Sequence, residues 1–454
     1  MNIPNPAKNS IERFKSYFYS MHTRIISRIS TDPLFKGILI IGSGSAIAQF
    51  SGIIFMPILT RIYPPEIFGT LAVFTSLLSI LIICGSFKYE VAIPLPETDD
   101  DAEYLFILSL FIVCTLTVSL LIILLLLGDF LAGIFHFEFI KPYYWLFCVG
   151  FFVICVYQIL LYWAIRSKDY ITITRTKIAQ SIGSSCSKII LGILSFGSIG
   201  LICGEIIGRM AGVTTLGRAI LPKIWLTIHG LNFHRLRSLT YKYKKFPTFS
   251  LPAGLISEIS LQIPILFLSA IFGFEIVGLY ELSYLMLVLP VSLIASSLVQ
   301  VFYGEAAEIF RNKPNEILAL YQKTTKKLFL FGAPLIFIGA VISPVVFPII
   351  FGSAWKDAGM FSLPLSIMVI AGFVVSSTDR LDLYGYNHWV LYWNLGRTFL
   401  IVSGFYFAHL VGLSPVATIL VFSLIITMMY GICYMLNIKA IKQVLHKNNA
   451  IIKK

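Results

Sequence analysis

The sequence has little charge and no catalytic or metal-binding signature. Asp, Glu, Lys and Arg together make up only 13% of the 454 residues, whereas 57% are hydrophobic. No GxxxxGK[ST] segment occurs, which excludes a P-loop ATPase. The seven cysteines form no CxxC pair, so we expect neither disulfides nor a metal site, and no cofactor is implied. Such an apolar composition is typical of proteins embedded in a membrane.

Long apolar runs follow one another along almost the whole chain. A helix needs about 20 apolar residues to cross a hydrocarbon core about 30 Å thick. The expected fold class is therefore all-α, a polytopic membrane protein with about 12 transmembrane helices. The predicted spans are residues 37–60, 66–87, 103–127, 142–165, 176–195, 199–217, 249–272, 276–302, 328–350, 358–378, 385–407 and 415–437.

The net charge of +13 follows the expected membrane topology. Only Arg61, Lys141 and Lys356 stand in loops that follow odd-numbered spans, whereas most of the 35 Lys and Arg residues lie in the two tails and the other loops. Because basic residues favour the cytoplasmic side, both termini are predicted to be cytoplasmic. This arrangement explains the basic composition without a nucleic acid partner.

The two halves of the chain contain a short internal repeat. Glu66-Ile67-Phe68-Gly69, after the first span, matches Glu275-Ile276-Val277-Gly278, after the seventh. Both copies have the same place in the predicted topology, which makes a duplication of six helices credible. Since both copies begin in the cytoplasm, they are parallel repeats, with a substrate path expected between them.

The repeat and the charges divide the chain into five segments. Residues 37–217 and 249–438 are expected to form N-terminal and C-terminal six-helix bundles, pseudo-symmetric around a central cleft. A basic cytoplasmic linker, 218–248, joins them. The tail at 1–36 mixes aromatics with Lys and Arg at helical spacing, which predicts an interfacial amphipathic helix. Residues 439–454 form a basic cytoplasmic tail.

Charged and polar side chains inside the spans are the candidates for function, because they are costly there unless they face a cavity or a partner. Glu205 and Arg209 lie four residues apart and could simply neutralise each other, and Lys188 could snorkel. Arg61 and Lys88 stand at membrane boundaries, where basic anchors are ordinary. The candidates for substrate binding and translocation are Arg397, Glu258, Lys188, Arg209, Glu205, Glu281, Gln49, Gln262, Asn394, Lys88 and Arg61.

Four segments carry a family resemblance. They are GSGSAIAQFSGIIFMPILTRIYPPEIFGTLAVF (42–74), GSFKYEVAIPLP (85–96), the stretch YQILLYWAIRSKDY…GEIIGRMAG (157–212) and GLYELSYLMLVLPVSLIASSLVQVFYGEAAE (278–308). With these segments the chain resembles bacterial polysaccharide (O-antigen-type) oligosaccharide flippases of the multidrug/oligosaccharidyl-lipid/polysaccharide (MOP) exporter superfamily. That superfamily also contains multidrug exporters and lipid II flippases.

The resemblance implies a multi-pass protein of the bacterial inner membrane that is not an enzyme. Its cargo would be an undecaprenyl-pyrophosphate-linked oligosaccharide repeat unit, moved from the inner to the outer leaflet by alternating access. Coupling to H+ or Na+ is possible in such a protein. Membrane lipids, a polysaccharide polymerase and the chain-length machinery are the other implied partners.

Three alternatives stay open. A multidrug exporter of the same superfamily would favour a cavity of carboxylates and aromatics, whereas Lys188, Arg209 and Arg397 lie at mid-membrane depth here. A membrane glycan polymerase is disfavoured by the short external loops. A non-transporting scaffold of the assembly machinery would tolerate point changes in the cavity.

Overall fold

The computed structural model describes residues 33–135, 141, 143–228, 232–312, 314–381, 384 and 386–452. Within these ranges, twelve long helices follow one another. They are α2 (Pro33–Ile62), α3 (Pro65–Ile82), α4 (Asp99–Phe135), α5 (Tyr144–Arg166), α6 (Tyr170–Ile193), α7 (Gly197–Ile228), α9 (Leu251–Phe272), α10 (Phe274–Asn312), α11 (Ile317–Phe351), α12 (Ala358–Ser376), α13 (Asn387–Val411) and α14 (Pro415–Ile452).

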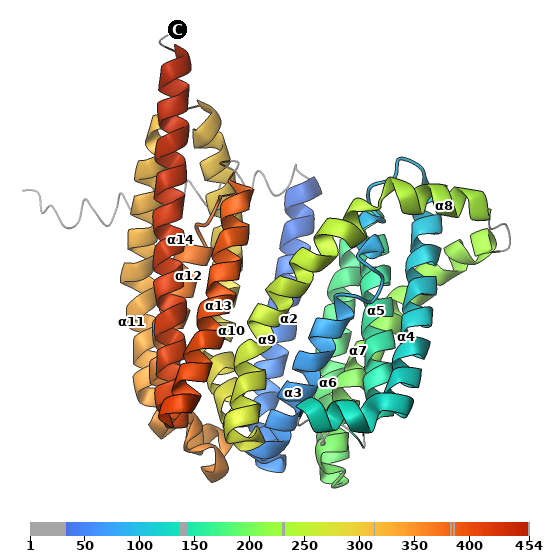
Figure 1. Cartoon of the computed structure of the whole chain (residues 1–454), viewed down its shortest axis with the longest axis horizontal. Helices are drawn as coiled ribbons and strands as arrows, with labels where there is room; N and C mark the ends of the chain where they lie inside the picture. The colour runs from blue at the N-terminus through green and yellow to red at the C-terminus, as the bar shows by residue number, and fades with distance from the viewer. Residues whose placement is uncertain are drawn as a thin grey trace, which may run out of the picture.

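The helices form two groups, which confirms the predicted all-α fold with two six-helix bundles around a central cleft. We call α2 to α7 the N-half and α9 to α14 the C-half. Figure 1 shows the groups meeting near the lower end of the view and spreading apart toward the upper end, where the C-terminus lies. Helix α9 runs diagonally between them, beside α3 and α13.

Ten of the helices are long and apolar enough to cross a membrane by themselves. The two long helices outside that set are α6 and α13, each the fifth helix of its half. Both are packed within their bundles, α6 against α2 and α7, and α13 against α9 and α14. Each therefore spans the membrane beside apolar neighbours, and its polar residues have protein partners or cavities to face.

Several helices extend beyond their predicted spans. Helix α4 begins at Asp99, α10 continues to Asn312 and α14 to Ile452. Hydropathy marks where the apolar run ends, but a helix can continue into water. The predicted linker 218–248 is largely helical, because α7 continues into it and is followed by α8 (Phe233–Lys242). The amphipathic helix predicted for the N-terminal tail lies outside the described residues.

The two copies of the repeat contact each other at the lower end. A Cβ on Gly69 would lie 1.8 Å from the Phe274 carbonyl oxygen, and one on Gly278 would lie 1.9 Å from the Pro65 carbonyl oxygen. The two contacts exchange equivalent positions of the repeat, as a pseudo-two-fold axis requires. Only glycine allows backbones to approach this closely, so the repeat marks where α3 and α10 cross.

A tryptophan from the C-half completes this junction. Trp355 follows α11 and is fully buried, and its Nε1 donates a 2.8 Å hydrogen bond to the Thr60 carbonyl of α2. Its ring meets Phe68 edge-on, with centroids 5.0 Å apart. Arg61 Nη2 lies 3.5 Å from the Ile349 carbonyl oxygen. These contacts join the halves at the lower end.

Candidate functional site

A polar cavity of about 630 Å³ lies where the N-half faces the C-half. Its polar wall comes from α2, α6 and α7, and three apolar residues of α10, Leu285, Met286 and Leu289, close the opposite side. We call it the cationic cleft, because three cations and one carboxylate line it. Its charged and amide side chains are Lys177, Lys188, Arg209, Glu205, Gln49 and Gln180.

Glu205 is the centre of a buried ion cluster. Its Oε2 accepts hydrogen bonds from Lys188 Nζ at 2.7 Å and from Ser184 Oγ at 3.2 Å. Its Oε1 accepts one from Arg209 Nε at 3.1 Å. The Glu205–Arg209 pair expected from the sequence is thus a triad that includes Lys188. Since Arg209 bonds through Nε and its side chain is 41% exposed, its terminal nitrogens remain available to the cleft.

Lys177 is a cleft residue that sequence reasoning misses. It stands at the edge of the expected span 176–195, where a lysine reads as a boundary anchor. In the structure its Nζ donates a 2.7 Å hydrogen bond to Ser45 Oγ of α2. A signal was present in the sequence, because Lys177, Ser181, Ser184 and Lys188 recur at helical spacing along one face of α6.

Glycines on α7 bring the ion cluster together. A Cβ on Gly204 would lie 2.5 Å from Lys188 Cγ, and one on Gly208 would lie 2.5 Å from Ser184 Cβ. Helices α6 and α7 therefore pack with their backbones close, as small residues at every fourth position allow. This approach places Lys188 within hydrogen-bond distance of Glu205.

Glu258 faces the other side of the same cluster. A smaller cavity of about 240 Å³ is lined by Glu205 and Arg209 from α7 and by Glu258 from α9 of the C-half. Gln262, one turn further along α9, donates a 2.7 Å hydrogen bond from Nε2 to Glu258 Oε1. Glu205 and Arg209 thus line both cavities, and Glu258 shares the smaller one with them.

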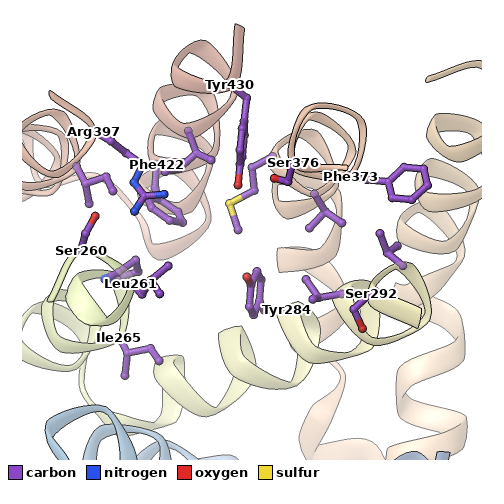
Figure 2. A pocket seen from close by; sticks show the side chains of 18 of the residues that line it. Ser260, Leu261, Ile265, Tyr284, Ser292, Phe373, Ser376, Arg397, Phe422 and Tyr430 are labelled. Atoms are coloured by element: carbon purple, nitrogen blue, oxygen red, sulfur yellow. The ribbon is translucent and has the colours of Figure 1, made fainter. Parts of the chain in front are cut away.

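Arg397 and Glu281 lie elsewhere, in a chamber of about 500 Å³ inside the C-half. Figure 2 shows Arg397 and Tyr430 reaching into this chamber from one side and Tyr284 from the opposite side. Arg397 Cζ lies 4.8 Å from the centroid of the Trp393 ring, and its Nε has no hydrogen-bond partner among the described residues. The candidates that line these cavities therefore divide between the two halves.

A polar contact links the cleft and the chamber. Gln49 of α2 lines the cleft, Ser292 of α10 lines the chamber, and Gln49 Oε1 lies 3.3 Å from Ser292 Oγ. Gln262 also lines the chamber besides bonding Glu258.

Three other candidates lie away from both cavities. Asn394, one turn from Arg397, uses its backbone carbonyl to accept a hydrogen bond from Thr398. Lys88 follows α3, with its Nζ 4.0 Å from Glu90 Oε1. Arg61 belongs to the lower junction. No group of three or more metal-ligating side chains occurs in the described ranges.

The cationic cleft can bind an anion, and its positive charge is only partly balanced by its own carboxylate. Glu205 neutralises part of the charge, while Lys177 and the outer face of Arg209 provide donors. Arginine and lysine both suit phosphate oxygens, arginine through parallel hydrogen bonds and lysine as a point charge.

A family model described as "Polysaccharide biosynthesis protein" matches residues 58–359, more than half of the chain. The chain belongs to this family. The matched segment begins in α2 and ends in α12, so it includes the residues of the cationic cleft from Leu59 onward, together with the lower junction. No curated protein matches the chain.

Solved structures similar to this polysaccharide biosynthesis family member are transporters of the MOP superfamily, as the sequence predicted. One, described as an inward-facing multidrug resistance MATE family transporter, aligns with a TM-score of 0.62 and 15% identity over 89% of this chain and 95% of that one. A mutant of the Vibrio cholerae MATE transporter VcmN aligns with a TM-score of 0.55 and 14% identity over 91% and 97%. A Pyrococcus furiosus transporter, described as having a binding pocket of reverse polarity, gives 0.54 and 13% over 90% and 96%.

Proposed function

We propose that this protein is a flippase for a lipid-linked oligosaccharide, translocating an undecaprenyl-pyrophosphate-linked repeat unit across the bacterial inner membrane. The observation that carries the proposal is the charge of the cationic cleft. Three cations and one carboxylate line about 630 Å³ at membrane depth. Even with Glu258 counted, cations outnumber carboxylates.

The physical problem of such a cargo matches this cleft. A hydrated sugar and a charged pyrophosphate cannot cross hydrocarbon unaided, because each bare polar group costs several kcal/mol to desolvate. Lys177, Lys188 and Arg209 replace water as donors to the phosphates, while Gln49, Gln180 and the serines of α6 suit sugar hydroxyls. The lipid tail stays in the bilayer throughout.

Membrane orientation and energy coupling belong to the same proposal. The upper end of Figure 1, with the C-terminus and α8, is cytoplasmic by the distribution of basic residues. The cleft between the halves would then accept cargo from the cytoplasm while the lower junction is joined. Glu258 and Glu281 are the carboxylates that H+ or Na+ would use if transport is coupled.

A multidrug exporter is the second candidate, because the similar solved structures include multidrug transporters. The C-half favours it more than the N-half does, since Glu281 and three tyrosines, Tyr280, Tyr284 and Tyr430, suit an organic cation in the chamber. The net positive charge of the cleft opposes it.

The test compares surface glycan in a bacterial strain that lacks the protein and is complemented with variants. Lys177→Gln and Lys188→Gln are expected to reduce surface glycan and to accumulate the undecaprenyl-linked single repeat unit. Arg175→Gln is the matched control, because Arg175 is exposed on the same helix and does not line the cleft. Normal glycan in the deletion strain, with increased sensitivity to cationic drugs, would favour the exporter instead.

A further inference from the structure

A groove of about 340 Å³ lies on the C-half, apart from the cleft and the chamber. Helices α13 and α14 form its walls. It is lined by Trp389, Tyr392 and Trp393 on α13 and by Met429, Ile432, Leu436 and Lys439 on α14. The lining is apolar and aromatic except for the lysine at one end.

The groove faces the hydrocarbon of the bilayer. Its α14 wall lies inside Pro415–Leu445, one of the segments apolar enough to span a membrane. Tyr392 on the opposite wall is 68% exposed. From Met429 to Lys439 the helix rises about 15 Å, which is the length of a substantial part of an acyl chain. In a membrane this surface is in contact with lipid chains.

The end of the groove carries a positive charge. Lys439 Nζ lies 5.4 Å from the centroid of Trp389, and among the described residues no carboxylate pairs with it. Lys439 follows the predicted span 415–437, so it stands where α14 leaves the hydrocarbon. Tryptophan and tyrosine beside a lysine at this depth suit the headgroup level of a bilayer.

The groove also has a rigid back wall. Trp393 Nε1 donates a 2.7 Å hydrogen bond to the Met429 carbonyl across the two helices. The same indole ring carries Arg397, the cation of the C-half chamber. An occupant of the groove would therefore press on the ring that positions Arg397.

We propose that this groove binds one chain of an anionic glycerophospholipid of the surrounding bilayer, with the lipid phosphate on Lys439. The apolar walls receive the acyl chain, and the lysine supplies the charge complement. The site is independent of the transported cargo, and its contact with Trp393 makes the chamber sensitive to lipid composition.

Bromolipid quenching of tryptophan fluorescence tests the proposal on the full-length protein. The protein is reconstituted in phosphatidylcholine vesicles that contain increasing fractions of brominated phosphatidylglycerol or of brominated phosphatidylcholine. Because Trp389 and Trp393 line the groove, wild type is expected to reach half-maximal quenching at about a fivefold lower fraction of phosphatidylglycerol. Lys439→Gln removes this preference, whereas Lys442→Gln, the control one turn away, retains it.

A second variant tests occupancy without removing charge. Leu436→Phe narrows the groove and is expected to reduce quenching by both lipids. Equal quenching by the two lipids in wild type, or equal loss in Lys439→Gln and Lys442→Gln, overturns the proposal. The proposal is also overturned if undecaprenyl phosphate displaces brominated phosphatidylglycerol more effectively than unlabelled phosphatidylglycerol does. The groove would then bind the carrier lipid.

Discussion

Replacing Glu205 by Gln is expected to destabilise the protein more than removing either of its cationic partners. Glu205 is the common acceptor of Lys188, Arg209 and Ser184. Its neutral replacement leaves two cations facing each other at membrane depth. Removing Lys188 or Arg209 instead leaves Glu205 with one remaining cation.

The expected loss of stability in each variant depends on how exposed the substituted side chain is to solvent. Breaking a fully buried ion pair by removing one partner costs about 3–5 kcal/mol. The side chain of Lys188 is 13% exposed and that of Glu205 is 22% exposed, so Glu205→Gln should cost about 2–3 kcal/mol. Arg209 is 41% exposed and can turn its guanidinium toward water, so Arg209→Gln should cost about 1 kcal/mol.

The assay is unfolding by sodium dodecyl sulfate in mixed micelles, followed by tryptophan fluorescence. The double variant Lys188→Met/Glu205→Gln should be more stable than the sum of the two single effects predicts. It removes the charge of Lys188, which Glu205→Gln alone leaves unpaired. Glu66→Gln is the control, since Glu66 is an exposed carboxylate outside the cluster. If the single effects add within about 0.5 kcal/mol, Lys188 and Glu205 do not interact and the triad is refuted.

Three further predictions concern other parts of the molecule. Lys177→Gln should weaken binding of undecaprenyl pyrophosphate about tenfold with little loss of stability, because Lys177 bonds a serine and, among the described residues, no carboxylate. Equal binding of the variant and wild type in a titration would contradict this role. Gly278→Val should separate the lower junction, because its Cβ would overlap the Pro65 carbonyl oxygen. Gly339→Val is the control, because a Cβ there meets open space. In an Arg61→Cys background, maleimide labelling of the new cysteine should rise with Gly278→Val and stay unchanged with Gly339→Val. Burial raises the pKa of Glu90, outside the spans, so its native form holds a proton more tightly than its unfolded form. Its contribution to stability is therefore lost as pH rises through the raised pKa, and the stability of wild type relative to Glu90→Gln should increase on acidification toward about 4.3. No change in that difference would exclude Glu90 as the titrating group.

The arrangement of the helices could be predicted from the sequence because hydropathy and charge act locally. Each span must bury its backbone polar groups within its own helix, so apolar length reveals ten of the twelve long helices among the described residues, and the exceptions are the more polar α6 and α13. The repeat at Glu66 and Glu275 predicted a duplication, and the structure adds that its two copies form the junction between the halves, since glycine at an equivalent place in each copy permits the same close crossing. Helix ends were less predictable, because α4, α10 and α14 continue beyond the membrane.

The division of the polar side chains among cavities could not be predicted. Membrane depth shows that Lys188 or Arg397 needs a partner or a cavity, but not which neighbouring helix supplies it. That choice depends on contacts between residues far apart in the sequence, such as Lys177 with Ser45 and Gln49 with Ser292. Lys177 escaped notice because it stands at the edge of its expected span, and the serine that it bonds lies on α2, more than a hundred residues earlier.

The duplication explains why each half has a cation on its fifth helix, and the neighbouring helices explain why the two cations have different partners. In each half the fifth helix is too polar to span a membrane unaided, and each of these helices carries a cation into a cavity: Lys188 on α6 and Arg397 on α13. Their packing partners differ, because α7 supplies Glu205 whereas α14 contains no Asp or Glu. The N-half cation is therefore neutralised by a carboxylate, and the C-half cation rests on the ring of Trp393. An aromatic ring leaves the charge of Arg397 intact, so in the chamber the carboxylate that can balance it is Glu281, from α10 and not from the helix paired with α13.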